Sequence, residues 1–109
     1  MKENITVPKL VIIGDSAYDT NRFIGEDGSH FFKTNYGGAG TYSSVPASLF
    51  YRVGLVSNAG EDFNGDKLKK FNIDLRGFHT RKDEKTSRFY NILKTRDGQE
   101  REIAAEYNE

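Results

Sequence analysis

A glycine-rich segment from Gly37 to Ser44 (GGAGTYSS) constrains this chain more than any other stretch. Two adjacent glycines let the backbone adopt a positive φ and approach a bound molecule with no Cβ in between. Ser43 and Ser44 can then cap the N–H groups at the start of an apolar helix, which the pattern predicts over residues 41–52. A helix N-terminus behind glycines suits an anion or a row of hydroxyl groups. The alternative interpretation is a tight turn followed by an ordinary capped helix.

Pro46 conflicts with a regular helix over this range. Proline is tolerated in the first helical turn, where its missing N–H would be unpaired anyway, but deeper in a helix it costs about 3 kcal/mol. We therefore expect the helix either to begin near residues 43–45 or to contain a local kink.

Two apolar runs rich in β-branched residues, Lys9 to Gly14 and Arg52 to Gly60, each end in glycine. Continuous runs of this kind favour strands covered on both faces, as in a parallel α/β sheet. A short helix is predicted over Asp66 to Phe71, and a third short strand from Ile73 to Thr80. The alternation of strands and helices predicts βαβ units with right-handed crossovers.

Two further segments are typical of β-hairpins. In the first, aromatic runs between Phe23 and Phe32 flank a turn at residues 25–29. In the second, residues 86–93 and 101–105 flank the pair Asp97-Gly98, which is a strong hairpin signal. The chain is thus predicted to combine a layered α/β core with two outlying hairpins, whose exposed aromatic side chains need a cover such as a second copy of the protein.

Composition excludes several classes of function. The 109 residues carry 16 basic and 16 acidic side chains, so nothing indicates a nucleic-acid or membrane-surface partner. The absence of cysteine excludes disulfides and thiolate metal sites, and His30 and His79 lack metal-ligand spacing. The N-terminus has no long apolar run, so we expect a cytoplasmic location.

The remaining polar groups are suited to a polyol. The glycine segment lacks the Gly-Lys-Ser/Thr of a phosphate-binding loop, and the first strand is followed by Asp15 and Ser16 rather than by a dinucleotide fingerprint. Asp19 follows the end of that strand, and its ionised carboxylate can accept hydrogen bonds from two vicinal hydroxyls. Gly37 and Gly38 can present backbone N–H groups to the same ligand. The alternative for Asp19 is a turn residue.

The order and spacing of these segments resemble the N-terminal portion of the ribokinase-like (PfkB) carbohydrate kinases. The resemblance extends from Leu10 to Asn108 and rests on residues 11–14, Asp19, residues 37–42, the Gly-x-Asp-x-x-Gly segment at 60–65, residues 71–74 and Thr86. It implies a Rossmann-like layered α/β sheet with a small β lid over the sugar, a lid that the family often uses for dimerisation. Residues 1–109 would then form a single partial domain, with lid hairpins at approximately 19–35 and 86–105.

The resemblance also assigns roles to individual residues. Asp19 falls at the sugar-binding aspartate of the family, Gly37 and Gly38 at its Gly-Gly sugar contact, and Asn108 near an asparagine at the end of the lid. Tyr42 stands where many members carry a sugar-binding asparagine, and a phenol there can stack on a ring or form a hydrogen bond. The substrate, a sugar or a nucleoside, therefore remains open.

ATP and Mg²⁺ are implied for the complete enzyme. The family's catalytic aspartate and Gly-Ala-Gly-Asp anion hole would lie beyond residue 109, so we expect these 109 residues to bind no cofactor and to phosphorylate nothing. One alternative is a non-catalytic α/β binding or dimerisation module derived from the same fold. Another is a nucleotide-binding Rossmann half, which the missing glycine fingerprint after Gly14 opposes.

Overall fold

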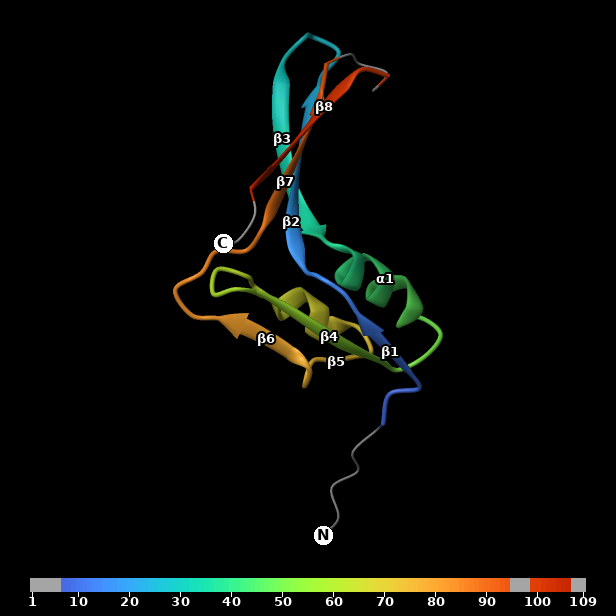
Figure 1. Cartoon of the computed structure of the whole chain (residues 1–109). Helices are drawn as coiled ribbons and strands as arrows, with labels where there is room; N and C mark the ends of the chain where they lie inside the picture. The colour runs from blue at the N-terminus through green and yellow to red at the C-terminus, as the bar shows by residue number, and fades with distance from the viewer. Residues whose placement is uncertain (1–6, 95–98, 107–109) are drawn as a thin grey trace.

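The chain folds into two sheets of four strands each, one rising from the end of the other (Figure 1). The structure is a computed structural model that describes residues 7–94 and 99–106. We call the two sheets the core sheet and the outer sheet. The core sheet contains β1 (Leu10–Ile13), β4 (Val53–Gly60), β5 (Ile73–Asp74) and β6 (Phe78–Arg81). The outer sheet contains β2 (Ala17–Ile24), β3 (His30–Gly37), β7 (Arg88–Leu93) and β8 (Arg101–Glu106).

The core sheet is parallel, as predicted. β1 pairs with one edge of β4, while β5 and β6 pair in turn with β4 on its other side. The single strand predicted from Ile73 to Thr80 is instead divided into β5 and β6. The division follows from a local turn in which the Asp74 carboxylate accepts the backbone N–H of Arg76 at 3.0 Å.

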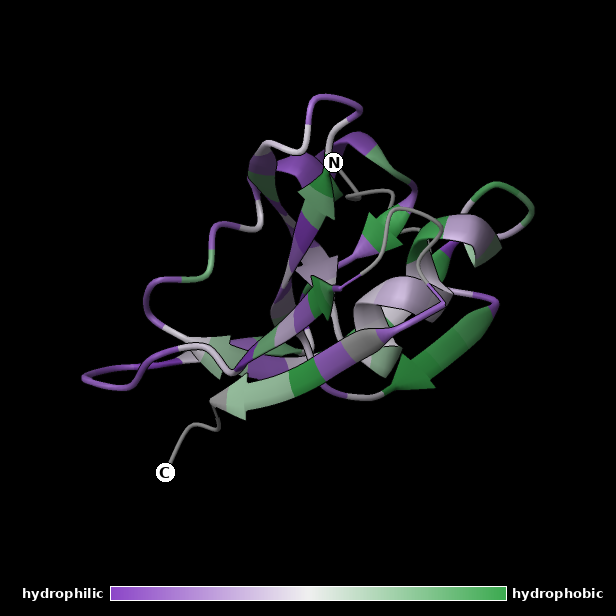
Figure 2. Cartoon of the chain, turned by 90° about the horizontal axis from the view of Figure 1, so that it is seen from above, coloured by the Kyte–Doolittle hydropathy of each residue, from purple (hydrophilic) through white to green (hydrophobic). Residues whose placement is uncertain are grey.

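The apolar run of β1 predicts a strand that is covered on both faces. Among the described residues, β1 is not covered in this way. Val11 is 56% exposed and Ile13 is 80% exposed, and β1 has β4 as its one described neighbour. In Figure 2, β1 is the strand coloured as hydrophobic along its whole length. A run of apolar residues indicates that a strand requires covering, but it does not indicate which segment supplies the cover.

The helix predicted over residues 41–52 is shorter and begins earlier. α1 spans Ala39–Ala47, and Pro46 lies in its last turn instead of near its start. The predicted caps are also wrong, because the N-cap is Gly38 and the Ser44 hydroxyl donates to the Gly40 carbonyl oxygen at 2.7 Å. Since Gly38 has φ 86°, a conformation that glycine adopts without strain, the turn itself starts the helix.

The outer sheet has the order β3-β2-β7-β8. The hairpin predicted around residues 25–29 is present, with β2 and β3 pairing antiparallel along eight residues each. β7 runs parallel to β2 and antiparallel to β8. Asp97 and Gly98 lie outside the described residues. The outer sheet therefore brings together two segments that are separated in sequence by α1 and much of the core.

The hydrophobic core lies between β4 and the short 3₁₀ helix η1 (Asp66–Lys70). Its buried members are Leu55, Ala59, Phe63, Leu68 and Ile73. Phe63 links the two sheets, since its ring centroid is 5.2 Å from those of Tyr18 and Tyr36 in the outer sheet and 5.3 Å from that of Phe78 in β6. Within the described part of the chain, no helix is both long and apolar enough to cross a membrane.

Candidate functional site

Asp19 and Gly37 lie against each other on neighbouring strands of the outer sheet. In the β2–β3 register, Asp19 is opposite Asn35, and Ala17 is opposite Gly37. A Cβ atom built on Gly37 would stand only 2.5 Å from Cγ of Asp19, a separation that real side chains do not tolerate. The carboxyl group therefore occupies space that only a glycine at position 37 leaves open.

The Asp19 carboxylate is available to a ligand. It is half-buried, and within residues 7–94 and 99–106 it has no hydrogen-bond or ion-pair partner. Burial raises the pKa of this carboxyl above its ordinary value, because desolvation disfavours the charged form. A half-buried acceptor that no described protein group engages is left to water or a ligand, and acids with pKa values shifted by burial gather at binding sites.

The strand register places further side chains beside Asp19 that sequence reasoning did not identify. Asp19 is paired with Asn35 on one side and with Phe89 on the other, and Phe89 is in turn opposite Ala105. Residues paired across neighbouring strands project from the same face of a sheet. Across the sheet, one face therefore carries the amide of Asn35, the carboxylate of Asp19 and the ring of Phe89 side by side. Only the pairing of β2 with β7 reveals it, because Phe89 lies 70 positions along the chain.

Gly38 holds the end of the outer sheet close to the strand that leaves the core. With its φ of 86°, a Cβ built on it would stand 2.8 Å from the Asp15 carbonyl carbon. The N–H of Gly40 donates to the same Asp15 carbonyl at 3.0 Å. At least one amide at the start of α1 is thus already paired within the protein, and Asp15 is itself an exposed acid beside it. This helix end is poorly suited to an anion.

Tyr42 lies apart from Asp19, in a cavity of about 650 Å³ at the junction of α1, β3 and η1. The cavity is lined by Tyr18, Tyr36, Tyr42, Pro46, Lys67, Phe71 and five smaller or polar neighbours. Because successive side chains alternate along a strand, Tyr18 and Asp19 project from opposite faces of β2. The cavity lining thus includes Tyr42 and two other tyrosines together with Asn35, the partner of Asp19 in the strand register, but not Asp19 or Gly37. Asn108 lies outside the described residues.

The described residues do not fit the nucleotide or the magnesium ion that the family resemblance implies. The amide of Gly40 at the glycine turn is hydrogen bonded to the Asp15 carbonyl, and the Asp15 side chain is an exposed acid. Among residues 7–94 and 99–106, no group of three or more histidines or acids is positioned to hold a metal ion.

Comparison with solved structures identifies the fold. A sugar kinase from Pyrococcus horikoshii, solved with ATP, superposes with a TM-score of 0.71 over 89% of this chain at 23% identity. Ribokinase from Arabidopsis thaliana, solved with ribose and ATP, gives 0.69 over 92% of this chain at 24% identity. A nucleoside kinase from Burkholderia thailandensis, solved with inosine, gives 0.75 over 91% of this chain at 13% identity.

These matches confirm a ribokinase-like α/β fold. The chain spans only 33–37% of the length of these three neighbours. No protein-family model matches the sequence, and no curated protein matches it either. At identities below 25%, the likeness establishes the architecture and leaves the ligand to be argued from the residues themselves.

Proposed function

We propose that this chain is the sugar-binding portion of a kinase that acts on a hydroxyl group of a sugar or nucleoside. The observation that carries this proposal is the half-buried Asp19 carboxylate, which has no described partner and is held against Gly37. The structural neighbours support it, since their names describe sugar and nucleoside kinases. The outer sheet would then act as a lid over the substrate.

In this proposal, Asp19 accepts hydrogen bonds from two neighbouring hydroxyl groups of the ligand, which a carboxylate can do with its two oxygens. Gly37 leaves room for the Asp19 carboxylate, Gly38 allows the tight turn beside it, and the backbone N–H groups of both are proposed contacts of the ligand. Asn35 adds an amide on the same face, and the Phe89 ring provides an apolar surface for the C–H groups of a sugar ring. Asn108 remains a candidate contact at the end of the lid.

Phosphoryl transfer itself is not assigned to these residues. The reaction requires a nucleotide cradle, a metal ion and a base on the accepting hydroxyl. ATP and Mg²⁺ are proposed for a complete enzyme, whereas the described residues contribute the orientation of the accepting polyol. We propose that the 109 residues alone catalyse no transfer.

The alternative is a non-catalytic binding or dimerisation module of the same fold. The exposed aromatic side chains of the outer sheet favour it, notably Phe31 and Phe32 on β3. A homodimer formed through the lid is compatible with either function. A cytoplasmic location is part of the proposal, and the balanced charge supports a protein without a nucleic-acid or membrane-surface partner.

Thermal unfolding of the purified chain with ribose, fructose or inosine tests the proposal, because a ligand that binds the folded state raises the melting temperature. We expect at least one polyol to raise the melting temperature. Asp19→Asn should lower the affinity for that polyol by about 10- to 100-fold, which corresponds to the loss of one charged hydrogen bond. A polyol that raises the melting temperature of wild type and Asp19→Asn equally would contradict the assignment. An assay for polyol-dependent ADP release should give no signal from the chain alone.

A further inference from the structure

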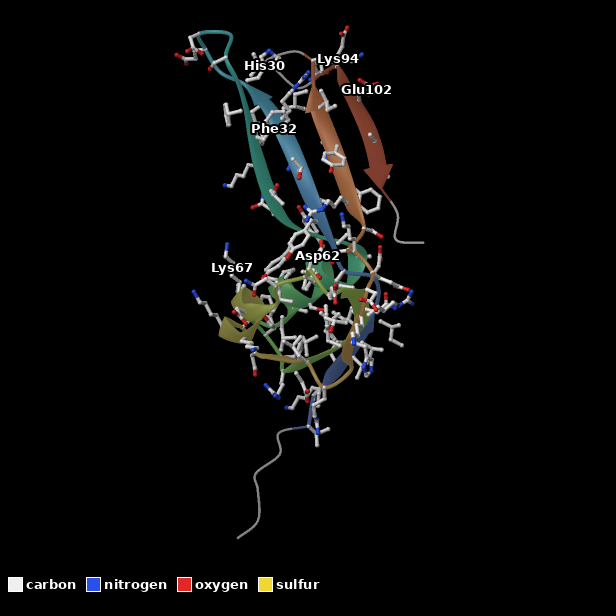
Figure 3. The ribbon with its side chains drawn as sticks, turned by 90° about the vertical axis from the view of Figure 1, so that its left-hand side faces the viewer. His30, Phe32, Asp62, Lys67, Lys94 and Glu102 are labelled. Carbon is white, nitrogen blue, oxygen red and sulfur yellow. The ribbon has the colours of Figure 1, made fainter. Side chains whose placement is uncertain are left out.

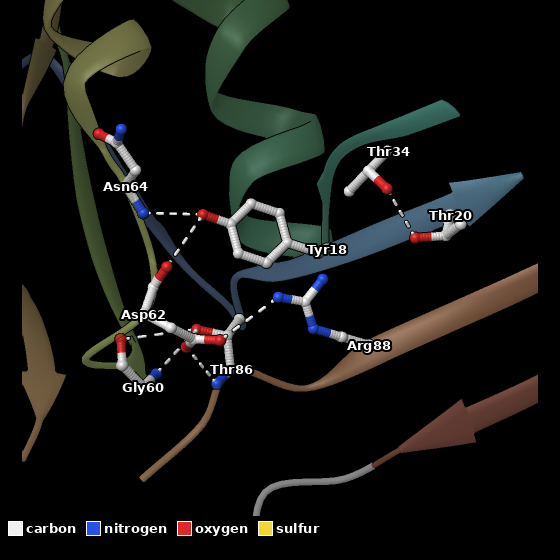
Figure 4. A network of polar contacts seen from close by, with 8 residues as sticks. All are labelled: Tyr18, Thr20, Thr34, Gly60, Asp62, Asn64, Thr86 and Arg88. Carbon is white, nitrogen blue, oxygen red and sulfur yellow. Dashed lines mark hydrogen bonds and ion pairs between the residues drawn. The ribbon is translucent and has the colours of Figure 1, made fainter. Parts of the chain in front are cut away.

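Thr86 joins the outer sheet to the end of β4. It is 3% exposed and lies where the chain leaves the core to enter β7. Its hydroxyl donates to Oδ1 of Asp62 at 2.6 Å, and its backbone N–H donates to the same oxygen at 2.7 Å (Figure 4). The Thr86 hydroxyl oxygen also accepts the backbone N–H of Gly60 at 3.1 Å. One buried hydroxyl therefore ties the root of β7 both to Gly60, the last residue of β4, and to Asp62, which follows it.

The backbone at this junction is packed without spare volume. A Cβ built on Gly60 would collide with the backbone of residues 84–86, so this segment rests directly on Gly60. The N–H of Glu61 donates to the carbonyl of Glu84 at 3.0 Å and adds a second backbone link. Close packing of this kind leaves few alternative arrangements for the start of β7.

The second strand that leaves the core is held by the same segment. The Tyr18 hydroxyl, at the start of β2, accepts the N–H of Asn64 at 2.7 Å and contacts the Asp62 carbonyl at 3.4 Å. The Arg88 guanidinium lies 4.9 Å from the centre of the Tyr18 ring and 3.4 Å from Oδ2 of Asp62. We call residues 62–64 the anchor segment. Figure 3 shows its first residue, Asp62, at the junction of the two sheets.

We infer that Asp62 is a positioning residue for the polyol site: through Thr86 and Arg88 it fixes the angle of the outer sheet over the core. The inference rests on the proposed function, because Asp19 lies on β2 and Phe89 on β7, the two strands that the anchor segment holds. Asp62 does not touch the proposed ligand. The outer sheet and the anchor segment move as one body, and the separate roots of β2 and β7 do not act as independent hinges.

Distance measurement between two spin labels tests this inference directly. The chain contains no cysteine, so Glu26→Cys in the turn of the outer sheet and Lys70→Cys in η1 provide two unique labelling positions, both exposed. We expect one narrow distance distribution for the otherwise wild-type chain. Asp62→Asn and Thr86→Val should each lose the narrow peak, whereas Thr86→Ser, which keeps the hydroxyl, should retain it.

Asp66→Asn is the matched control, because Asp66 is an exposed acid four positions away whose described ion pair is with Lys69 on η1. It should leave the distribution unchanged. A folded Asp62→Asn or Thr86→Val variant with the wild-type distribution would overturn the inference, and if Asp62→Asn does not fold, Thr86→Val decides alone.

The same variants separate this inference from the proposed function. A polyol that binds the wild-type chain should bind Asp62→Asn about 10- to 100-fold more weakly, the cost of misplacing groups in a site by about 1 Å. If no polyol binds the wild-type chain, the proposed function fails, while the spin-label result still shows whether Asp62 positions the outer sheet. If a polyol binds and Asp62→Asn binds it equally well, the positioning role is wrong and the proposed function stands.

Discussion

The Asp19 carboxyl group packs directly against the bare Cα of Gly37, its diagonal neighbour on β3. Because a Cβ at position 37 would stand 2.5 Å from Cγ of Asp19, even the smallest side chain must displace the carboxylate. The strand pairing and the glycine together determine where this acid lies.

Gly37→Ala should push the Asp19 carboxylate into another rotamer, and because the displaced atoms end a flexible, half-buried side chain, the cost should be about 1 kcal/mol. Chemical denaturation measures the change in the free energy of unfolding. Gly65→Ala is the control, because the nearest heavy atom to a Cβ there is 3.9 Å away and its φ of −87° suits any residue. Equal stabilities of the two variants would show that the Asp19–Gly37 contact is not tight.

Asp19→Asn should leave the protein at least as stable as wild type at pH 7. Burial raises the pKa of Asp19 in the folded state, so ionisation at neutral pH costs stability that a neutral amide does not. As the pH falls below the raised pKa, the wild-type carboxyl takes up its proton and the advantage of asparagine should disappear. Melting temperatures of both proteins between pH 7 and pH 3 measure this. A variant that is less stable than wild type at pH 7 would contradict the prediction.

Acid stability should depend on Asp74. Its hydrogen bonds with the Arg76 side chain and backbone hold the pKa of Asp74 at about 2. A carboxyl with a lowered folded-state pKa stabilises the protein above its unfolded pKa of about 4, and this contribution is lost as the pH falls towards about 2. Asp74→Asn should therefore be less stable than wild type at pH 7, with the difference shrinking between pH 4 and pH 2. A difference that is constant over this range would exclude the ionised pair as its cause.

The exposed aromatic residues of the outer sheet should drive self-association. Phe32 is 67% exposed and lies towards the far end of the sheet (Figure 3), where apolar surface favours contact with a second copy. Sedimentation velocity at rising concentration should show dimers for the wild-type chain and weaker association for Phe32→Ser. Lys33→Ser, at the next exposed position of β3, is the control. A wild-type chain that remains monomeric at high concentration would contradict this prediction.

The sequence predicted the parallel core and the first hairpin because both depend on local patterns. The apolar runs that became β1 and β4 and the turn at residues 25–29 each carry their own signal. The helix bounds were wrong because Gly38, with its positive φ, starts α1 earlier than the serines predicted. Local propensity cannot distinguish a serine that caps a helix from one that bonds back to the previous turn, as Ser44 does.

The candidate site was predicted only in part, for a related reason. Asp19 and Gly37 were identified individually, but their contact depends on the register of β2 with β3. The pairing of Asp19 with Phe89 depends on the parallel alignment of β2 with β7. Most of the core lies between these two strands in the sequence, so no short motif encodes their alignment. The separation of Tyr42 from Asp19 likewise follows from the alternation of side chains along β2 and from the path of α1.

The most direct test of the central claim is a titration of the ¹⁵N-labelled chain with ribose, fructose and inosine, followed by amide chemical shifts. The account predicts that at least one of these polyols shifts the amides of Asp19, Gly37, Gly38 and Phe89, and that Asp19→Asn loses these shifts while its other amides stay in place. Shifts confined to the cavity around Tyr18, Tyr36 and Tyr42, or no shifts with any of the three, would contradict a polyol site at Asp19.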